Sequence, residues 1–219
     1  MVARPTRPVA PRIGAPDLPT SLERVSRVEA RADLLGVEIL DLSGEVDAPH
    51  SHIAEARVAP ASVGRLDLTG ASLVDVAVVE LRAVEMIARD GTWRNVEISG
   101  GRIATIDASR ARWDSVAVRG VHVDYLNLAS AELADVLFVD CRFGTVDIPE
   151  ARLSRVSFEQ CRADEVDTRG LRAGDLDLRG LEAGAFTDAR SLAGAWIDER
   201  QAEMHAATFA QALGIRLAS

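Results

Sequence analysis

Apolar residues recur at every fifth position through most of the chain. From Ile53 to Leu178, each residue five places further on is apolar, with Thr168 as the exception. A second column, two residues earlier, is apolar or small over the same span, and the residue between the columns is mostly polar. Five residues rotate by about 140° around a helix, which would scatter such a column over its surface. The pattern instead predicts a three-residue strand, with both ends pointing inward, followed by a corner.

A second period, of ten residues, indicates the number of sides in each coil. In the inward column before each centre, large residues such as Val76, Met86 and Val96 alternate with small ones such as Ala71 and Gly91, with a few exceptions. A three-sided coil of fifteen residues cannot keep a period of ten, and a two-sided coil leaves no interior. The sequence therefore predicts four-sided coils of twenty residues, stacked as parallel strands about 4.8 Å apart.

The register of the repeat predicts where the stack of coils begins and ends. Blocks of twenty residues align without insertion from Ala56 to about Ala185. The segment 31–42 reads as a first coil that is one residue out of register and rejoins the main register near Val46. We expect seven to eight coils, and therefore a rod of roughly 36 Å that needs a cap at each end.

Several segments carry a recognisable motif, among them ASLVD (71–75), AELAD (131–135), LDLTG (66–70) and LDLRG (176–180). On these segments the chain resembles the pentapeptide-repeat family, over roughly residues 32–198. The resemblance implies an all-β fold, a right-handed quadrilateral parallel β-helix. The middle position departs from the family pattern, because Arg and Glu are as common there as Asp or Asn.

The two flanks differ from the repeat. Residues 1–31 hold five of the eight prolines and have six arginines against three acidic residues. Such a Pro/Arg-rich tail is expected to be disordered. Residues 32–198 form the predicted β-helix, and residues 199–219 are predicted to be a capping helix of about fifteen residues followed by a short tail. In that helix Asp198 is the expected N-cap, Glu199 lies in the first turn, and Gly214 ends it.

The C-terminal helix is also the expected dimer interface. In the fluoroquinolone-resistance members of the family, a similar terminal element forms a homodimer, and the resemblance implies the same here. The expected interface residues are Phe209, Leu213, Ile215 and Leu217. A plain lid over the last coil is the alternative.

The sequence shows no enzyme-like constellation. No histidine lies in a recognisable frame beside a nucleophilic Ser or Cys, and no glycine-rich phosphate loop is present. His50 and His52 lack further metal ligands at a known spacing, so they are expected to be surface residues. Cys141 and Cys161 lie one coil apart and are expected to be a buried, reduced pair. We therefore expect no catalytic residues, no metal and no cofactor.

Charge bears on the kind of partner. The 219 residues carry 25 basic and 34 acidic side chains, a net charge of −9, which argues against direct nucleic-acid binding. The resemblance implies a DNA mimic that inhibits DNA gyrase or another type II topoisomerase and confers fluoroquinolone resistance. The candidate acidic row is Asp107, Asp147 and Asp167. However, the body carries only −12, whereas B-DNA of the same length carries about 21 negative charges, so no dominant acidic stripe is predicted.

An outward apolar group suggests another contact with a protein. Its members, on the first face of the coil, are Ala77, Val79, Ala117, Leu137 and Val139. An apolar group on a charged surface is a candidate docking patch. The alternative function is therefore a scaffold or interaction module for an unidentified protein. No segment is apolar over 18 residues, the first residues lack an apolar signal region, and two cysteines suit a reducing compartment, so we expect a cytoplasmic protein.

Overall fold

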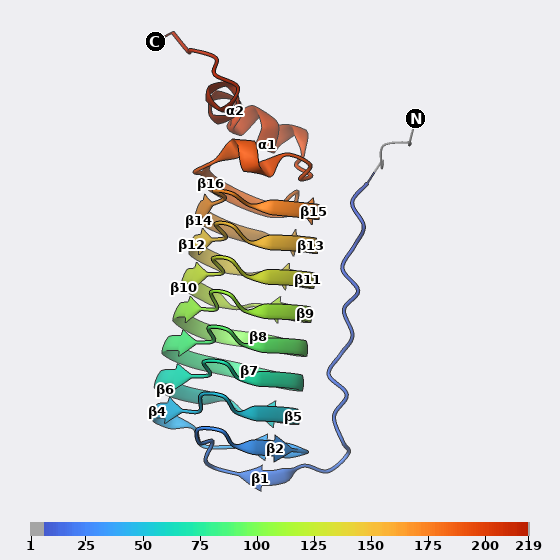
Figure 1. Cartoon of the computed structure of the whole chain (residues 1–219), viewed down its shortest axis with the longest axis vertical. Helices are drawn as coiled ribbons and strands as arrows, with labels where there is room; N and C mark the ends of the chain where they lie inside the picture. Colours follow the sequence, from blue (N-terminus) through green and yellow to red (C-terminus); the bar gives the residue numbers. More distant parts are fainter. Residues whose placement is uncertain (1–6, 219) are drawn as a thin grey trace.

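The computed structural model describes residues 7–218, which form a parallel β-solenoid of about eight turns with a short helical region at its C-terminal end (Figure 1). The early strands are β1 (Glu23–Val25), β2 (Asp33–Leu35), β3 (Val37–Ile39), β4 (Ser43–Asp47), β5 (His52–Val58), β6 (Ala61–Asp67), β7 (Ser72–Ile87) and β8 (Thr92–Asp107). The later strands are β9 (Arg112–Arg119), β10 (His122–Asn127), β11 (Glu132–Val139), β12 (Arg142–Asp147), β13 (Arg152–Glu159), β14 (Cys161–Asp167), β15 (Arg172–Asp177) and β16 (Leu181–Phe186). After them come a 3-10 turn (Ala189–Leu192), α1 (Glu199–Met204) and α2 (Ala206–Ala212).

The predicted twenty-residue register is confirmed along the rod. Leu133 pairs in parallel with Trp113 on one side and with Leu153 on the other, each twenty positions away. The first strand, β1, pairs with β3 at an offset of fourteen, as in Glu23 with Val37. The next strands pair at nineteen, as in Asp33 with His52, and the offset becomes twenty at an irregularity between Gly44 and Glu45. The predicted return to register near Val46 is therefore confirmed.

The corners explain the polar column of the sequence. In most of the corner columns at multiples of five the residue has a positive φ, for example +54° at Asp75, +49° at Glu80 and +57° at Asp90. This left-handed backbone suits Asp, Asn, Ser and Gly and disfavours β-branched apolar residues. The corner column from Arg65 through Tyr125 to Ala185 has no positive φ. Tyr125, the one large aromatic residue among the corner positions, therefore occupies the corner type that does not need a left-handed residue.

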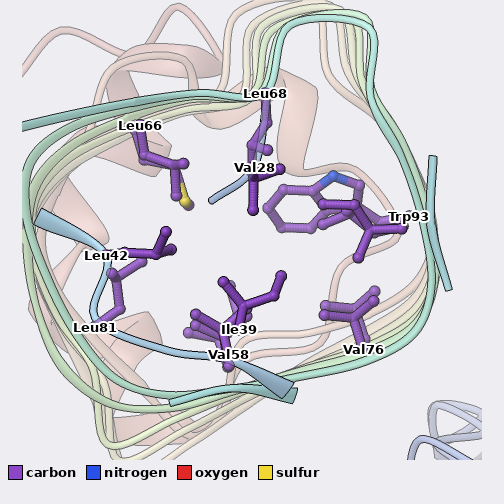
Figure 2. Close-up of a pocket in the computed structure, with 15 residues that line it drawn as sticks. Val28, Ile39, Leu42, Val58, Leu66, Leu68, Val76, Leu81 and Trp93 are labelled. Carbon is purple, nitrogen blue, oxygen red and sulfur yellow. The ribbon is translucent and has the colours of Figure 1, made fainter. Parts of the chain in front are cut away.

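The interior is a continuous apolar column. Trp93 and Trp113 stack with their ring centroids 4.8 Å apart, and Phe138 stacks on Phe158 at the same separation. Near the N-terminal end the packing leaves a cavity of about 40 Å³ lined entirely by apolar side chains, including Ile39, which point into a common interior (Figure 2). An apolar void of this size is expected to remain empty of water, so it is a packing defect and not a polar site.

The N-terminal segment differs from the prediction that residues 1–31 are disordered. Residues 23–25 form β1 and pair in parallel with β3, so the sheet begins earlier than residue 32. Residues 7–19, here called the arm, run along the outside of the rod from its C-terminal end to β1 (Figure 1). Pro-rich composition suggested disorder because it cannot form a core, but the arm packs on a core that already exists. Residues 1–6 lie outside the described residues.

Candidate functional site

The predicted apolar patch on the first face is smaller than the sequence suggested. Ala117 is 1% exposed, so it is not available to a partner. It lies in register between Glu97 and Leu137, whose larger side chains flank it. Ala77, Val79, Leu137 and Val139 are each half-buried. The remaining patch is therefore centred on Leu137, with modest exposure.

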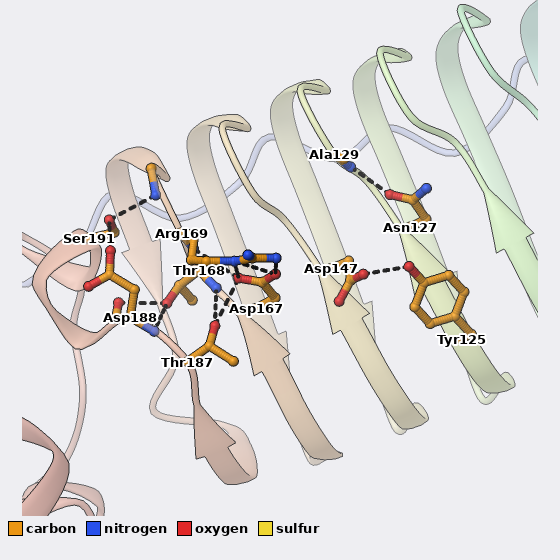
Figure 3. Close-up of polar contacts among 11 residues, drawn as sticks. Tyr125, Asn127, Ala129, Asp147, Asp167, Thr168, Arg169, Thr187, Asp188 and Ser191 are labelled. Atoms are coloured by element: carbon orange, nitrogen blue, oxygen red, sulfur yellow. Dashed lines mark hydrogen bonds and ion pairs between the residues drawn. The ribbon is translucent and has the colours of Figure 1, made fainter.

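The predicted acidic row on the third face is engaged within the rod (Figure 3). Oδ1 of Asp107 accepts a hydrogen bond from the Ser109 amide at 3.1 Å, and Oδ1 of Asp167 accepts one from the Arg169 amide at the same distance. Asp147 accepts a hydrogen bond from the Tyr125 hydroxyl. These carboxylates cap turns or bind neighbouring side chains, so they are structural groups of the coil.

Arginines neutralise part of this row. The Arg169 guanidinium binds Asp167 through both Nε and Nη2, with distances down to 2.5 Å. Hydrogen bonds from Arg169 and Thr187 lower the pKa of Asp167 to about 2, although burial opposes the shift. The hydrogen bond that the Tyr125 hydroxyl donates to Asp147 raises the pKa of Tyr125 to about 12. Paired in this way, the row offers little of the unshielded negative charge that a phosphate backbone presents.

The C-terminal helix is shorter than predicted and is interrupted at His205. Asp198 caps α1 as expected: its side chain accepts from the Gln201 amide, and the Gln201 side chain accepts from the Asp198 amide, which completes a capping box. His205 is buried and makes an edge contact with Phe186 of the last strand, so the rod anchors the chain at the break. Gly214 has φ +79° and ends α2, as predicted.

The predicted dimer residues divide into two groups. Phe209 is half-buried against the core, whereas Leu213, Ile215 and Leu217 are 78%, 53% and 53% exposed. An open, largely apolar cleft adjoins Leu213, and its walls include Leu192 and Ile197. The C-terminal end thus presents a larger exposed apolar surface than the Leu137 patch.

The two cysteines lie inside the rod, whereas His50 and His52 lie on its surface. Cys141 and Cys161 are free and buried, and hydrogen bonding with Cys141 and burial raise the pKa of the Cys161 thiol. His50 and His52 are exposed. Among residues 7–218, no three His, Cys, Asp or Glu side chains are grouped to hold a metal ion. Within the same residues, no helix has the length and apolar character needed to cross a bilayer.

A row of corner residues that the sequence analysis did not single out holds the arm. We call it the corner row, and it consists of Asp75, Asn95, Ser115, Asp135, Arg155 and Asp175. Four arm amides donate to side chains of this row: Val9 to Asp175 at 3.1 Å, Arg12 to Asp135 at 2.9 Å, Gly14 to Ser115 at 3.2 Å and Asp17 to Asp75 at 3.1 Å. The Asn95 side-chain amide donates to the Ala15 carbonyl at 3.1 Å. The twenty-residue spacing of short polar residues was the available signal.

Comparison with known proteins adds no family or relative. No protein-family model matches the chain, and no curated protein sequence matches it either.

Proposed function

We propose that the protein is a non-catalytic, protein-binding solenoid of the pentapeptide-repeat type that self-associates through its C-terminal end. The observation that carries the proposal is the exposure of Leu213 at an apolar cleft, together with the exposure of Ile215 and Leu217, which follow it in the chain. Exposed apolar groups that are contiguous mark interaction surfaces in water-soluble folds. A two-fold contact would place this surface of each copy against the same surface of the other.

Sedimentation velocity of the full chain over a range of concentrations tests self-association. We expect a dimer for the wild type and a monomer for Leu213→Asp, with unchanged far-UV circular dichroism. Val84→Asp is the matched control, because Val84 is a similarly exposed apolar residue, 66% accessible, on the rod. A monomeric wild type, or a Val84→Asp variant that dissociates as readily as Leu213→Asp, would contradict the proposal.

The Leu137 patch is the surface we propose for a different protein partner. It is supported by the half-exposed Leu137, Val79 and Val139 on one face of the rod. Capture of a partner by the full chain should be lost in Leu137→Asp and kept in Val84→Asp. Equal capture by both variants would exclude the patch. The cysteine content fits a reducing location for such a complex, and we place it in the cytoplasm.

Gyrase inhibition by DNA mimicry is the second proposal, favoured by the net charge of −9 and by the resemblance. The hydrogen bonds and ion pairs of Asp107 and Asp167 weigh against that row as the mimicking surface. Titration of the full chain against gyrase supercoiling tests the proposal. Inhibition at stoichiometric amounts would support it, and no effect at large excess would eliminate it.

A further inference from the structure

The arm follows the corner row in one direction along the rod, and its average pitch can be calculated from its hydrogen bonds. Between Val9 and Asp17 the chain advances eight residues, while its bonding partners move from Asp175 to Asp75, which is five coils. Five strand spacings of about 4.8 Å amount to about 24 Å, or about 3.0 Å per arm residue. The polyproline II helix rises about 3.1 Å per residue, so the arm has the pitch of that conformation.

The two repeats also match in phase. One turn of polyproline II takes three residues and about 9.3 Å, which is close to two coils of the rod at about 9.6 Å. Val9 and Arg12, three residues apart, bind Asp175 and Asp135, which are two coils apart. The pair formed by Gly14 and Asp17, bound to Ser115 and Asp75, repeats this relation. Within each pair, an amide of a polyproline II helix therefore meets an acceptor of the corner row again one turn later. Between Arg12 and Gly14 the chain advances two residues for one coil, so the two pairs lie on different sides of the helix.

Prolines precede three of the four donors. Pro8, Pro11 and Pro16 come directly before the three donors Val9, Arg12 and Asp17. The proline rings are half-buried, whereas the side chains of the three donors are exposed. A proline ring fixes φ near the polyproline II value and lowers the entropy lost on docking. The row thus contacts a Pro–Xaa unit through the amide of Xaa and leaves the Xaa side chain free.

Contacts within the rod, in addition to those with the arm, hold the acceptors in place. The Arg155 guanidinium binds both oxygens of Asp135, each at 2.7 Å, and Asp135 is only 7% exposed. Asn95 donates to Asp75, and both residues have a left-handed backbone that fixes the corner. The rod therefore presents a rigid row of acceptors. The donors are main-chain amides of the arm, and the residues that carry them are of different types.

We propose that the corner row is a binding site for polyproline II segments with Pro–Xaa units spaced as in the arm, three and five residues apart, and that the arm occupies it in cis. A partner's segment of this kind would bind after displacing the arm. Since a short tether gives an effective concentration in the millimolar range, the arm is a strong competitor for its own site. This site borders the Leu137 patch, because Asp135 lies two residues before Leu137 in β11. It uses other residues than the patch and the C-terminal surface, so different substitutions test it.

Two full-length variants, each with three substitutions, test the site. One is designed to release the arm from the corner row, and the other is its control. Val9→Pro, Arg12→Pro and Asp17→Pro together remove three donating N–H groups and keep the polyproline II conformation, so the arm should no longer dock. The control is Val9→Ala, Arg12→Ala and Asp17→Ala, which removes the same side chains but keeps the N–H groups. Circular dichroism and thermal unfolding should show an intact rod for both, because none of these side chains is buried.

The probe is a fluorescein-labelled peptide with the sequence of residues 7–19, followed by fluorescence anisotropy. We expect the proline variant to bind it at least about tenfold more tightly than the alanine control, in which the arm still competes. Adding Asp175→Ala to the proline variant should weaken binding. A peptide with alanine at Pro8, Pro11 and Pro16 should also bind more weakly. Absence of binding to the proline variant, or equal binding to the alanine control, would overturn the proposal.

Discussion

Trp93 and Trp113 lie face to face inside the rod, with ring centroids 4.8 Å apart and ring planes inclined by 6°. The separation matches the strand spacing, because identical residues one coil apart stack directly. Both indole Nε1 atoms are buried and have no hydrogen-bond partner among residues 7–218. The pair therefore combines favourable stacking with the unfavourable burial of two unpaired N–H groups.

We expect Trp113→Ala to lower the free energy of unfolding by about 3–5 kcal/mol, because it leaves a large cavity beside Trp93. Trp113→Phe should destabilise much less, since a phenyl ring keeps the stack and removes one unpaired N–H. Urea unfolding followed by circular dichroism measures both changes. Equal destabilisation by Phe and Ala would show that the unpaired N–H is not a significant penalty.

The coil could be predicted from the sequence because each inward position has one physical option. A residue such as Leu133 must be apolar wherever the chain closes a filled solenoid, so the five-residue period survives without long-range information. The corners added a second constraint, because a left-handed backbone conformation, as at Asp135, disfavours bulky apolar residues.

The arm and the cap could not be predicted in the same way. The arm is held by main-chain amides, which every residue except proline has, so the bond from Val9 to Asp175 across 166 positions leaves no mark on apolar periodicity. Gln201 was missed for a similar reason: a polar residue in a charged segment such as 198–203 usually faces solvent, whereas this one is 3% exposed.

Gln201 closes the C-terminal end of the rod. Its side-chain amide donates to the carbonyls of Leu178 and Leu181, both at 2.7 Å. We expect Gln201→Ala to destabilise the protein by about 1–3 kcal/mol, because the carbonyls of Leu178 and Leu181 each lose the hydrogen bond from the Gln201 side chain. Gln211→Ala, at an exposed position of α2, is the control and should be nearly neutral. Thermal unfolding by calorimetry compares them, and equal midpoints would contradict the capping role.

Asp167 should make stability depend on pH in the acid range. Its pKa is lowered from 3.8 to about 2, chiefly by the hydrogen bond from Arg169, so the folded state favours the carboxylate. The corresponding stability is fully present above the unfolded-state value of 3.8 and is lost as the pH falls towards 2.

Asp167→Asn should therefore reduce the free energy of unfolding by about 1–2 kcal/mol at neutral pH and flatten its decline below pH 4. The control is Asp164→Asn, because Asp164 has a side chain that is 75% exposed and lies 3.9 Å from Arg162. Urea midpoints measured from neutral pH to the acid range give the comparison. If the free energy of unfolding of Asp167→Asn declined with falling pH as steeply as that of the wild type, other groups would be responsible for the acid sensitivity.

Two glycines at the same position of their pentapeptides should respond in opposite ways to alanine. A Cβ added at Gly144 would lie 2.4 Å from the carbonyl oxygen of Asp124 on the neighbouring strand, so the backbone would have to move. A Cβ at Gly174 would meet no atom within 4 Å, and neither glycine has a positive φ. We expect Gly144→Ala to destabilise by about 1–3 kcal/mol, as overpacking does.

Gly174→Ala should instead be neutral or stabilising by up to about 1 kcal/mol, because alanine lowers the entropy of the unfolded chain. Chemical denaturation of the two variants alongside the wild type provides the measurement. Both glycines lie in β-strands and have no side chain to lose. The opposite changes in stability therefore follow only from how closely the neighbouring strand approaches each glycine. If both variants shifted the midpoint in the same direction, the close approach of β12 to β10 at Gly144 would not be the determinant of this position.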